Sequence, residues 1–151
     1  MQIKNQILKK AIEMARKSTV KKSRMGAVIF TRKGGIIACG NNRRIDGKKA
    51  YTIHAEQDVI SRAMRKIKLK DFSRYFLLVV RINRKNDELV ISRPCKKCTE
   101  LLRWLKMGVY FVDRKGKVVE GWWYYTGIFL DAKNTREDLI AIEKDTVHMS
   151  P

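Results

Sequence analysis

A mostly apolar run near the middle of the chain limits the folds open to it more than any other feature. Residues 76–82 read Phe-Leu-Leu-Val-Val-Arg-Ile. Such a run is typical of a strand that is buried on both faces, unlike the strict alternation of a strand with one wet face. We therefore expect a central strand here, in a sheet that other elements cover on both sides.

Helical spacing of apolar residues recurs before and after this strand. Residues 3–15 and 55–67 repeat apolar side chains at steps of three and four, which predicts two amphipathic helices. Pro94 is suited to opening a third helix, whose pattern continues to Leu105 and which we expect Gly108 to end. A capping-box pattern at Thr135 and Asp138 predicts a short last helix.

Two further pairs of β-prone segments flank short turns. Residues 27–31 and 36–39 are separated by a turn that contains Gly34-Gly35, which predicts a β-hairpin. Residues 109–113 and 118–125 are joined by only four residues, too few for the crossover that parallel neighbours need. These last two strands should be antiparallel. Earlier in the chain, the polar segment 40–50 is expected to be a loop.

Two short motifs carry metal and proton chemistry. The first is His54-Ala55-Glu56, at the start of the second predicted helix, and the second is Pro94-Cys95-Lys96-Lys97-Cys98, at the start of the third. Zinc prefers nitrogen and sulfur donors, and a catalytic zinc site keeps three protein ligands and one open position for water. His54, Cys95 and Cys98 supply three such donors, so we expect a catalytic Zn²⁺ site.

Glu56 is the candidate catalytic residue. A zinc ion lowers the pKa of a bound water, but a hydrolytic reaction must also move protons from that water to the leaving group. Glu56 lies two residues after the histidine and is not needed as a ligand, so it can act as general base and then general acid.

A closed zinc knuckle and a redox Cys-x-x-Cys are the competing interpretations of the two thiols. A knuckle needs four ligands, and neither Cys39 nor His148 has motif spacing to the other donors. The intact Glu56 also argues against a zinc-binding module without catalysis.

The two motifs resemble those of the zinc-dependent cytidine and deoxycytidylate deaminase superfamily. This resemblance covers about residues 25–113 and implies a three-layer α-β-α fold with a five-stranded mixed sheet. We expect residues 1–151 to form one deaminase domain. The resemblance also implies that backbone N–H groups near Ala55 and Cys95 assist the reaction. Asn42, or failing that Asn41, is expected to hold the ribose or base.

The charge of the chain points to a polyanionic partner. The formal net charge is +19, with 14 basic and 2 acidic residues in 1–50 against 3 and 6 in 118–151. A strongly basic, uneven distribution is typical of nucleic-acid binding. Arg93 should border the substrate pocket. The residues expected to contact nucleic acid are Arg43, Arg44, Lys48, Lys49, Lys96, Lys97, Trp122 and Tyr124.

The aromatic residues admit two interpretations. Alternation along a strand would turn half of residues 122–125 outward, where they could stack on bases, but tryptophan on a strand also packs readily into a core. Trp104 is expected in the core or in an interface.

Members of the superfamily differ in substrate, and the metal site does not separate them. We favour conversion of cytidine to uridine in RNA, such as tRNA, or in single-stranded DNA, because binding of a polynucleotide accounts for the charge. Free cytidine or deoxycytidylate is the alternative. Free cytidine deaminases generally have cysteine where this chain has His54. Enzymes that resemble tRNA adenosine deaminases usually have other residues at Arg93 and Lys96-Lys97, so adenosine is disfavoured.

Other sequence features limit the cellular location that we expect for the protein. No run of residues reaches the length of a membrane span, and three cysteines are too few for a disulfide framework. We expect a cytoplasmic protein with no membrane partner. Related proteins range from monomers to tetramers, so the resemblance is compatible with a homo-oligomer.

Overall fold

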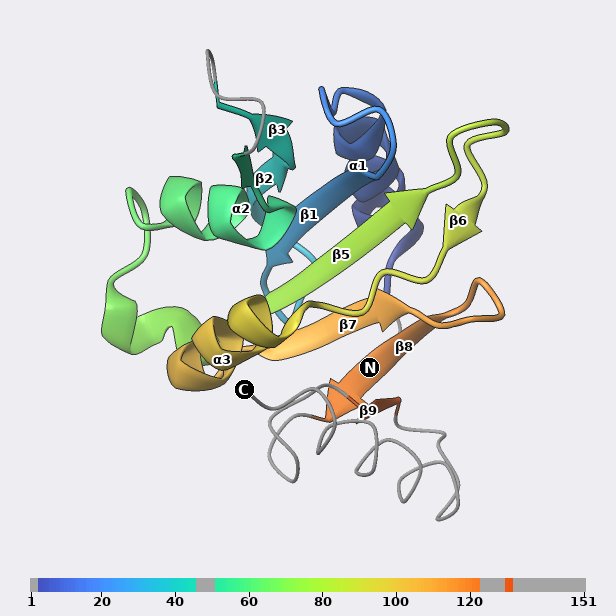
Figure 1. The fold of residues 1–151 in the computed structure, drawn as a ribbon. Coiled ribbons are helices and arrows are strands. Elements are labelled where there is room, and N and C mark those ends of the chain that lie inside the picture. Colours follow the sequence, from blue (N-terminus) through green and yellow to red (C-terminus); the bar gives the residue numbers. More distant parts are fainter. Residues whose placement is uncertain (1–2, 46–50, 123–129, 132–151) are drawn as a thin grey trace.

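A mixed β-sheet forms the middle of the structure (Figure 1). The computed structural model describes residues 3–45, 51–122 and 130–131. In spatial order the strands of the sheet are β2 (Ile36–Asn41), β1 (Arg24–Phe30), β5 (Phe76–Ile82), β7 (Gly108–Val112), β8 (Val118–Trp122) and β9 (Leu130–Asp131). A further short strand, β6 (Leu89–Val90), pairs with the end of β5.

The strand directions confirm the predicted mixed sheet. β5 and β7 are parallel, whereas the β1–β2, β1–β5 and β7–β8 pairs are antiparallel. The antiparallel pairing of the last two predicted strands is therefore confirmed. The five longer strands correspond to the five that were predicted, and β6 and β9 add two residues each.

Helices cover both faces of the sheet, which confirms the three-layer α-β-α fold (Figure 1). On one face, α1 (Asn5–Arg16) buries Ile7, Ala11 and Ala15 in a cluster with one set of β1 and β5 side chains. On the other, α2 (Ala55–Ala63) and α3 (Lys96–Leu105) share a second cluster with the alternate set. The central strand is thus apolar on both sides because each side faces a helix.

A glycine allows α1 to lie directly on β1. A Cβ atom built at Gly26 would lie 2.0 Å from the carbonyl oxygen of Ala11 and 2.6 Å from the backbone nitrogen of Ala15. Only a residue without a side chain fits between this helix and this strand.

The segment expected to be a loop is more regular than predicted. β2 continues to Asn41, and β3 (Arg43–Arg44) pairs antiparallel with β4 (Thr52–Ile53) in a separate two-stranded sheet. This small sheet leads straight into α2, so it fixes the approach of the chain to the first motif. Residues 46–50 lie outside the described part of the chain.

The third helix ends earlier than predicted. Its C-cap is Lys106, in the left-handed conformation with φ 58°, and Gly108 is already the first residue of β7. A side chain at Gly108 would collide with the neighbouring strand, because its Cβ would lie 2.5 Å from the Phe76 ring. A 3-10 helix, η1 (Leu69–Arg74), packs beside α3. The predicted helix near Thr135 lies outside the described residues.

Within the described ranges, none of the helices is both long enough and apolar enough to cross a membrane.

Candidate metal centre

His54 stands at the junction of β4 and α2. It is the N-cap of α2, with extended backbone angles of φ −72° and ψ 153°. Its backbone N–H donates a hydrogen bond of 3.0 Å to Oε1 of Gln57, the third residue of the helix. This contact is half of a capping box, and it holds the histidine at the helix start.

The two thiols come from the start of α3. Cys95 is the N-cap and is exposed, whereas Cys98 is 1% exposed. The Cys95 carbonyl oxygen accepts a hydrogen bond of 2.8 Å from the Thr99 N–H, so both cysteines belong to one tight turn. A Cys-x-x-Cys sequence wrapped in this way brings its two sulfur atoms to the same side of the helix.

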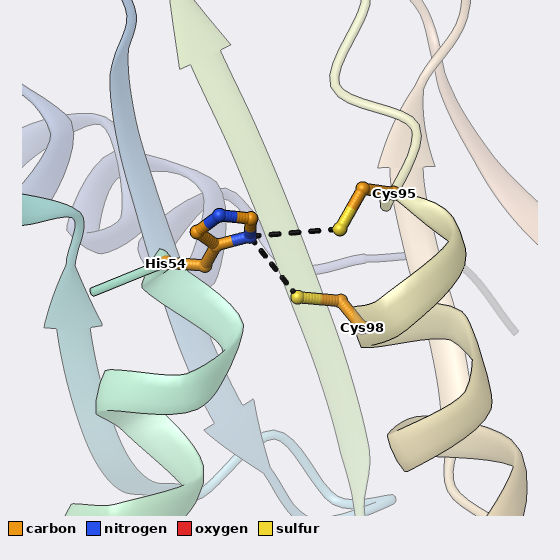
Figure 2. Close-up of side chains that lie close together, drawn as sticks. All are labelled: His54, Cys95 and Cys98. Carbon is orange, nitrogen blue, oxygen red and sulfur yellow. Dashed lines mark hydrogen bonds between the residues drawn. The ribbon is translucent and has the colours of Figure 1, made fainter. Parts of the chain in front are cut away.

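The three predicted ligands meet over the sheet, between α2 and α3 (Figure 2). Nδ1 of His54 lies 3.3 Å from Sγ of Cys98 and 3.6 Å from Sγ of Cys95. All three ligand atoms lie within 4.8 Å of one another. One imidazole nitrogen and two sulfurs are donors that zinc prefers, and three of them leave a coordination position for water.

The electrostatics of the Cys98 thiol agree with a site for a cation. Burial raises the pKa of the Cys98 thiol, and the nearby Glu56 carboxylate and Cys95 raise it further. A coordinating divalent cation reverses this tendency, because it deprotonates a thiol outright. The cluster of sulfur and carboxylate groups therefore fits a positive ion much better than it fits a merely apolar core.

Glu56 lies beside the cluster, in the first turn of α2, and is 2% exposed. Its Oε1 atom makes no hydrogen bond within the part of the chain that the structure describes. Burial raises the pKa of this carboxyl, while its own backbone, His54 and Cys98 oppose the rise. A buried carboxylate oxygen without a protein partner is costly, and its position is compatible with the predicted catalytic role of Glu56.

Comparison with known families identifies the chain. The family model described as "Cytidine and deoxycytidylate deaminase zinc-binding region" matches residues 1–121. This chain belongs to that family. It is therefore a zinc-dependent hydrolytic deaminase of the kind that acts on cytosine, and Zn²⁺ is its cofactor.

Solved structures of cytidine deaminases share the fold. One from Burkholderia pseudomallei has a TM-score of 0.60 at 16% identity, over 79% of this chain and 91% of that one. One from Mycobacterium leprae has a TM-score of 0.51 at 19% identity, over 77% and 91%. A dCMP deaminase from the cyanophage S-TIM5 gives a lower TM-score of 0.46 at 18% identity, over 70% and 80%. No curated protein matches the sequence at a significant level.

The two asparagines expected to hold substrate are both buried, Asn41 as the last residue of β2 and Asn42 directly after it. Oδ1 of Asn42 accepts hydrogen bonds from the Ser18 hydroxyl and the Met25 N–H, and its amide nitrogen donates to the carbonyl oxygen of Ser23. The Asn41 amide donates to the carbonyl oxygen of Met14. These bonds tie β2 to the segments around α1 and β1, and a substrate role for either residue stays a prediction.

The basic residues expected near the pocket fall into three groups. Arg43 and Arg44 are exposed on β3, and Lys96 and Lys97 are exposed at the start of α3. Arg93 is half-buried, with its guanidinium 5.5 Å from the centre of the Phe111 ring. The side chain of Ala55 is buried in the core beneath α2. Lys48, Lys49 and Tyr124, and the side chain of Trp122, lie outside what the structure describes.

Asp58, a buried carboxylate one turn after His54, was not predicted from the sequence. It accepts hydrogen bonds from the Asn41 N–H at 3.1 Å, from Arg43 at 3.3 Å and from Arg62 at 3.2 Å. Asp58 thus joins α2, β2 and β3 around the approach to the metal centre. Its spacing of four residues before Arg62 is the one sequence signal that could have drawn attention to it.

Proposed function

We propose that this protein hydrolyses cytosine to uracil in unpaired cytidines of a polynucleotide, either RNA or single-stranded DNA. The observation that carries the deaminase chemistry is the meeting of His54, Cys95 and Cys98 beside the buried carboxylate of Glu56. The preference for a polynucleotide substrate rests on the basic side chains around the metal centre.

In this proposal the imidazole of His54 and the thiolates of Cys95 and Cys98 hold the zinc ion. Bound zinc supplies Lewis acidity, which lowers the pKa of a water molecule enough for it to attack at neutral pH. The reaction forms a C4–O bond and breaks the C4–N bond of cytosine, releasing ammonia. The protein must therefore remove protons from the attacking water and deliver them to the base.

Glu56 is the group that carries these protons. Its side chain is buried next to the proposed ligands, and Oε1 makes no hydrogen bond within the described residues that would hold it elsewhere. The carboxylate first accepts a proton from the attacking water as general base. It then donates a proton to the ring nitrogen, and a further transfer protonates the departing amine.

Cations on two sides of the metal centre support a polynucleotide substrate. Lys96 and Lys97 separate the two proposed cysteine ligands in the sequence, and both side chains are exposed. Arg43 pairs across the small sheet with Ile53, the residue before His54. Phosphates on either side of a target nucleotide would meet positive charge from both α3 and β3. A strand that flanks the target has several phosphates and can use several such contacts, whereas a single nucleotide has only one phosphate group to bind.

A free deoxycytidylate is the second candidate, and one contact favours it. The guanidinium of Arg43 is held by the buried Asp58, 3.3 Å away, so it is a fixed cation near the site. One positioned arginine is well suited to a single phosphate.

The deciding experiment measures uracil formation by the zinc-loaded protein. The substrates are cytidine-containing RNA and single-stranded DNA oligonucleotides, free cytidine, deoxycytidine and their monophosphates. We expect conversion in an oligonucleotide, with kcat/KM at least about tenfold above that of any free species. Conversion of free species alone would reject the polynucleotide substrate and leave a salvage deaminase.

The Glu56→Gln variant tests the proton carrier in the same assay. The substitution keeps the size of the side chain and all three proposed ligands but removes the proton-accepting carboxylate. We expect zinc content to stay at the wild-type value while kcat falls by at least about a hundredfold, as general acid–base catalysis predicts. A variant with normal zinc and a normal rate would refute the role of Glu56.

A further inference from the structure

A second feature of α3 lies further along the helix from the metal centre. Trp104 is 67% exposed and Leu69, on the adjacent η1, is 47% exposed. The sequence predicts this tryptophan in the core or in an interface, and within the described residues it is not part of the core. An exposed tryptophan beside an exposed leucine indicates a surface that binds something.

These two residues line a groove between η1 and α3 of about 480 Å³. The other lining residues are Lys70, Ser73, Leu105 and Lys106. The volume falls in the range of roughly 300–1,000 Å³ that holds small organic ligands, so a nucleobase fits it. Among the described residues, the lining contains two lysines and no acidic side chain.

The charge around the groove selects the kind of partner. Lysine is depleted in protein–protein interfaces, whereas a flat aromatic ring among lysines is the usual platform for single-stranded nucleic acid. Arg103, next to Trp104, is also exposed, and Glu100 is the single acidic residue of α3. The combination of an open indole face with surrounding cations complements a base and its phosphates.

The helix connects this groove to the metal centre. Lys97 and Trp104 are seven residues apart on α3, so they share one face of the helix about 10 Å apart along its axis. A strand that leaves the metal centre past Lys97 would reach Trp104 within a short distance.

We propose that the groove formed by Leu69, Lys70, Trp104 and Lys106 binds a flanking nucleotide of a single-stranded nucleic acid, whose base stacks on Trp104. This proposal rests on the proposed polynucleotide substrate. It assigns a second contact point outside the metal centre, which lengthens the binding site along α3.

The test measures binding rather than turnover. A fluorescently labelled oligouridine of about twelve nucleotides is titrated with wild-type protein, and Kd is read from anisotropy. Trp104→Ala should weaken binding by at least about fivefold, which corresponds to the loss of about 1 kcal/mol of base stacking. Trp104→Tyr keeps an aromatic face and should stay within about twofold of wild type. Because Trp104 is exposed, both variants should fold, which their thermal midpoints check.

Charge variants separate the groove from the general positive charge of the protein. The Lys70→Gln/Lys106→Gln double variant should weaken binding and reduce the slope of log Kd against log salt by about 1.4 units, since each of the two phosphate contacts to a single strand contributes about 0.7. The matched control is Lys9→Gln/Lys33→Gln, at exposed positions on α1 and in the β1–β2 turn. It removes the same charge and should leave Kd within about twofold.

The outcomes distinguish this proposal from the proposed function. Oligonucleotide deamination with no dependence of binding on Trp104 would overturn the groove and leave the substrate assignment intact. Trp104-dependent binding of oligouridine without cytidine turnover would support the groove and count against the substrate. If light scattering shows that Trp104→Ala converts a dimer into a monomer, the groove is an interface with a second copy and the proposal fails.

Discussion

At the scale of single residues, Cys98 tests whether the proposed ligands hold the metal. It is a buried residue of α3 and one of the three proposed ligands, and a serine in its place would keep the size but not the sulfur donor. We expect Cys98→Ser to contain less than about a tenth of the wild-type zinc. It should also unfold at a lower temperature, because metal binding and folding are coupled.

Metal analysis and thermal unfolding together check this expectation. The matched control is Cys39→Ser, at the half-buried free cysteine in β2, outside the cluster. It should keep one zinc ion per chain. Wild-type zinc content in Cys98→Ser would show that the ligand set is wrong.

At the scale of elements, the contact between α1 and β1 depends on Gly26. The Cβ of an alanine there would overlap the backbone of α1 at Ala11, and backbone atoms cannot turn away as a flexible side chain can. Gly26→Ala should therefore lower the free energy of unfolding by about 1–3 kcal/mol or more, as overpacking does.

Denaturant unfolding measures this loss, with Gly35→Ala as the control. Among the described residues, a Cβ at Gly35 would meet the side chain of Thr31 alone, at 3.2 Å. This partly exposed side chain can adjust by a few tenths of an ångström, so the control should change stability by less than about 1 kcal/mol. Equal losses in the two variants would contradict the close approach of α1 to β1.

The junction of the parallel strands β5 and β7 depends on Ser92. Its buried hydroxyl donates a hydrogen bond of 2.8 Å to the Val79 carbonyl oxygen and accepts one of 2.8 Å from the Val112 N–H. This bridge also fixes the segment that leads into Cys95. Ser92→Ala should cost about 1–3 kcal/mol, because it leaves buried backbone groups without this partner.

Thermal or denaturant unfolding again gives the measurement, with the exposed Ser73→Ala as control. The control removes the same hydroxyl from a solvated position and should be nearly neutral. A Ser92→Ala variant as stable as the wild type would show that the two strands do not need the bridge.

At the scale of the whole molecule, the net charge of +19 predicts that activity on an oligonucleotide depends on salt concentration. If a flanking strand makes three phosphate contacts, the logarithm of its affinity falls with a slope of about −2 against log salt. From about 50 to about 200 mM salt, we expect kcat/KM for an oligonucleotide to fall about twentyfold, and that for a free nucleoside to change by less than about twofold.

Steady-state rates at several salt concentrations check this expectation. Free cytidine is the internal control, because it has no phosphate and uses the same metal centre. A parallel fall for both substrates would mean that salt acts on the fold or on the metal and not on strand binding.

Several parts of the fold and the site follow from local patterns. The apolar run 76–82 indicated a strand covered on both faces, and the structure confirms this burial. The two motifs indicated His54, Cys95 and Cys98, which the fold then brings together beside Glu56. Such predictions are possible because apolar surface and donor type are properties of the residues themselves. The antiparallel pairing of β7 and β8 follows from the short connection between them.

Only the tertiary structure decided what depends on contacts between distant segments. The buried role of Asp58, the short sheet of β3 and β4, and the exposure of Trp104 each depend on which elements pack together. The pattern of α3 placed Trp104 near apolar positions, but the neighbouring η1 leaves its ring exposed. The sequence by itself determined which donor atoms are available for zinc, because each donor atom is a property of the residue type that carries it. The surface around the metal centre was decided by packing, because exposure is a property of the assembled chain.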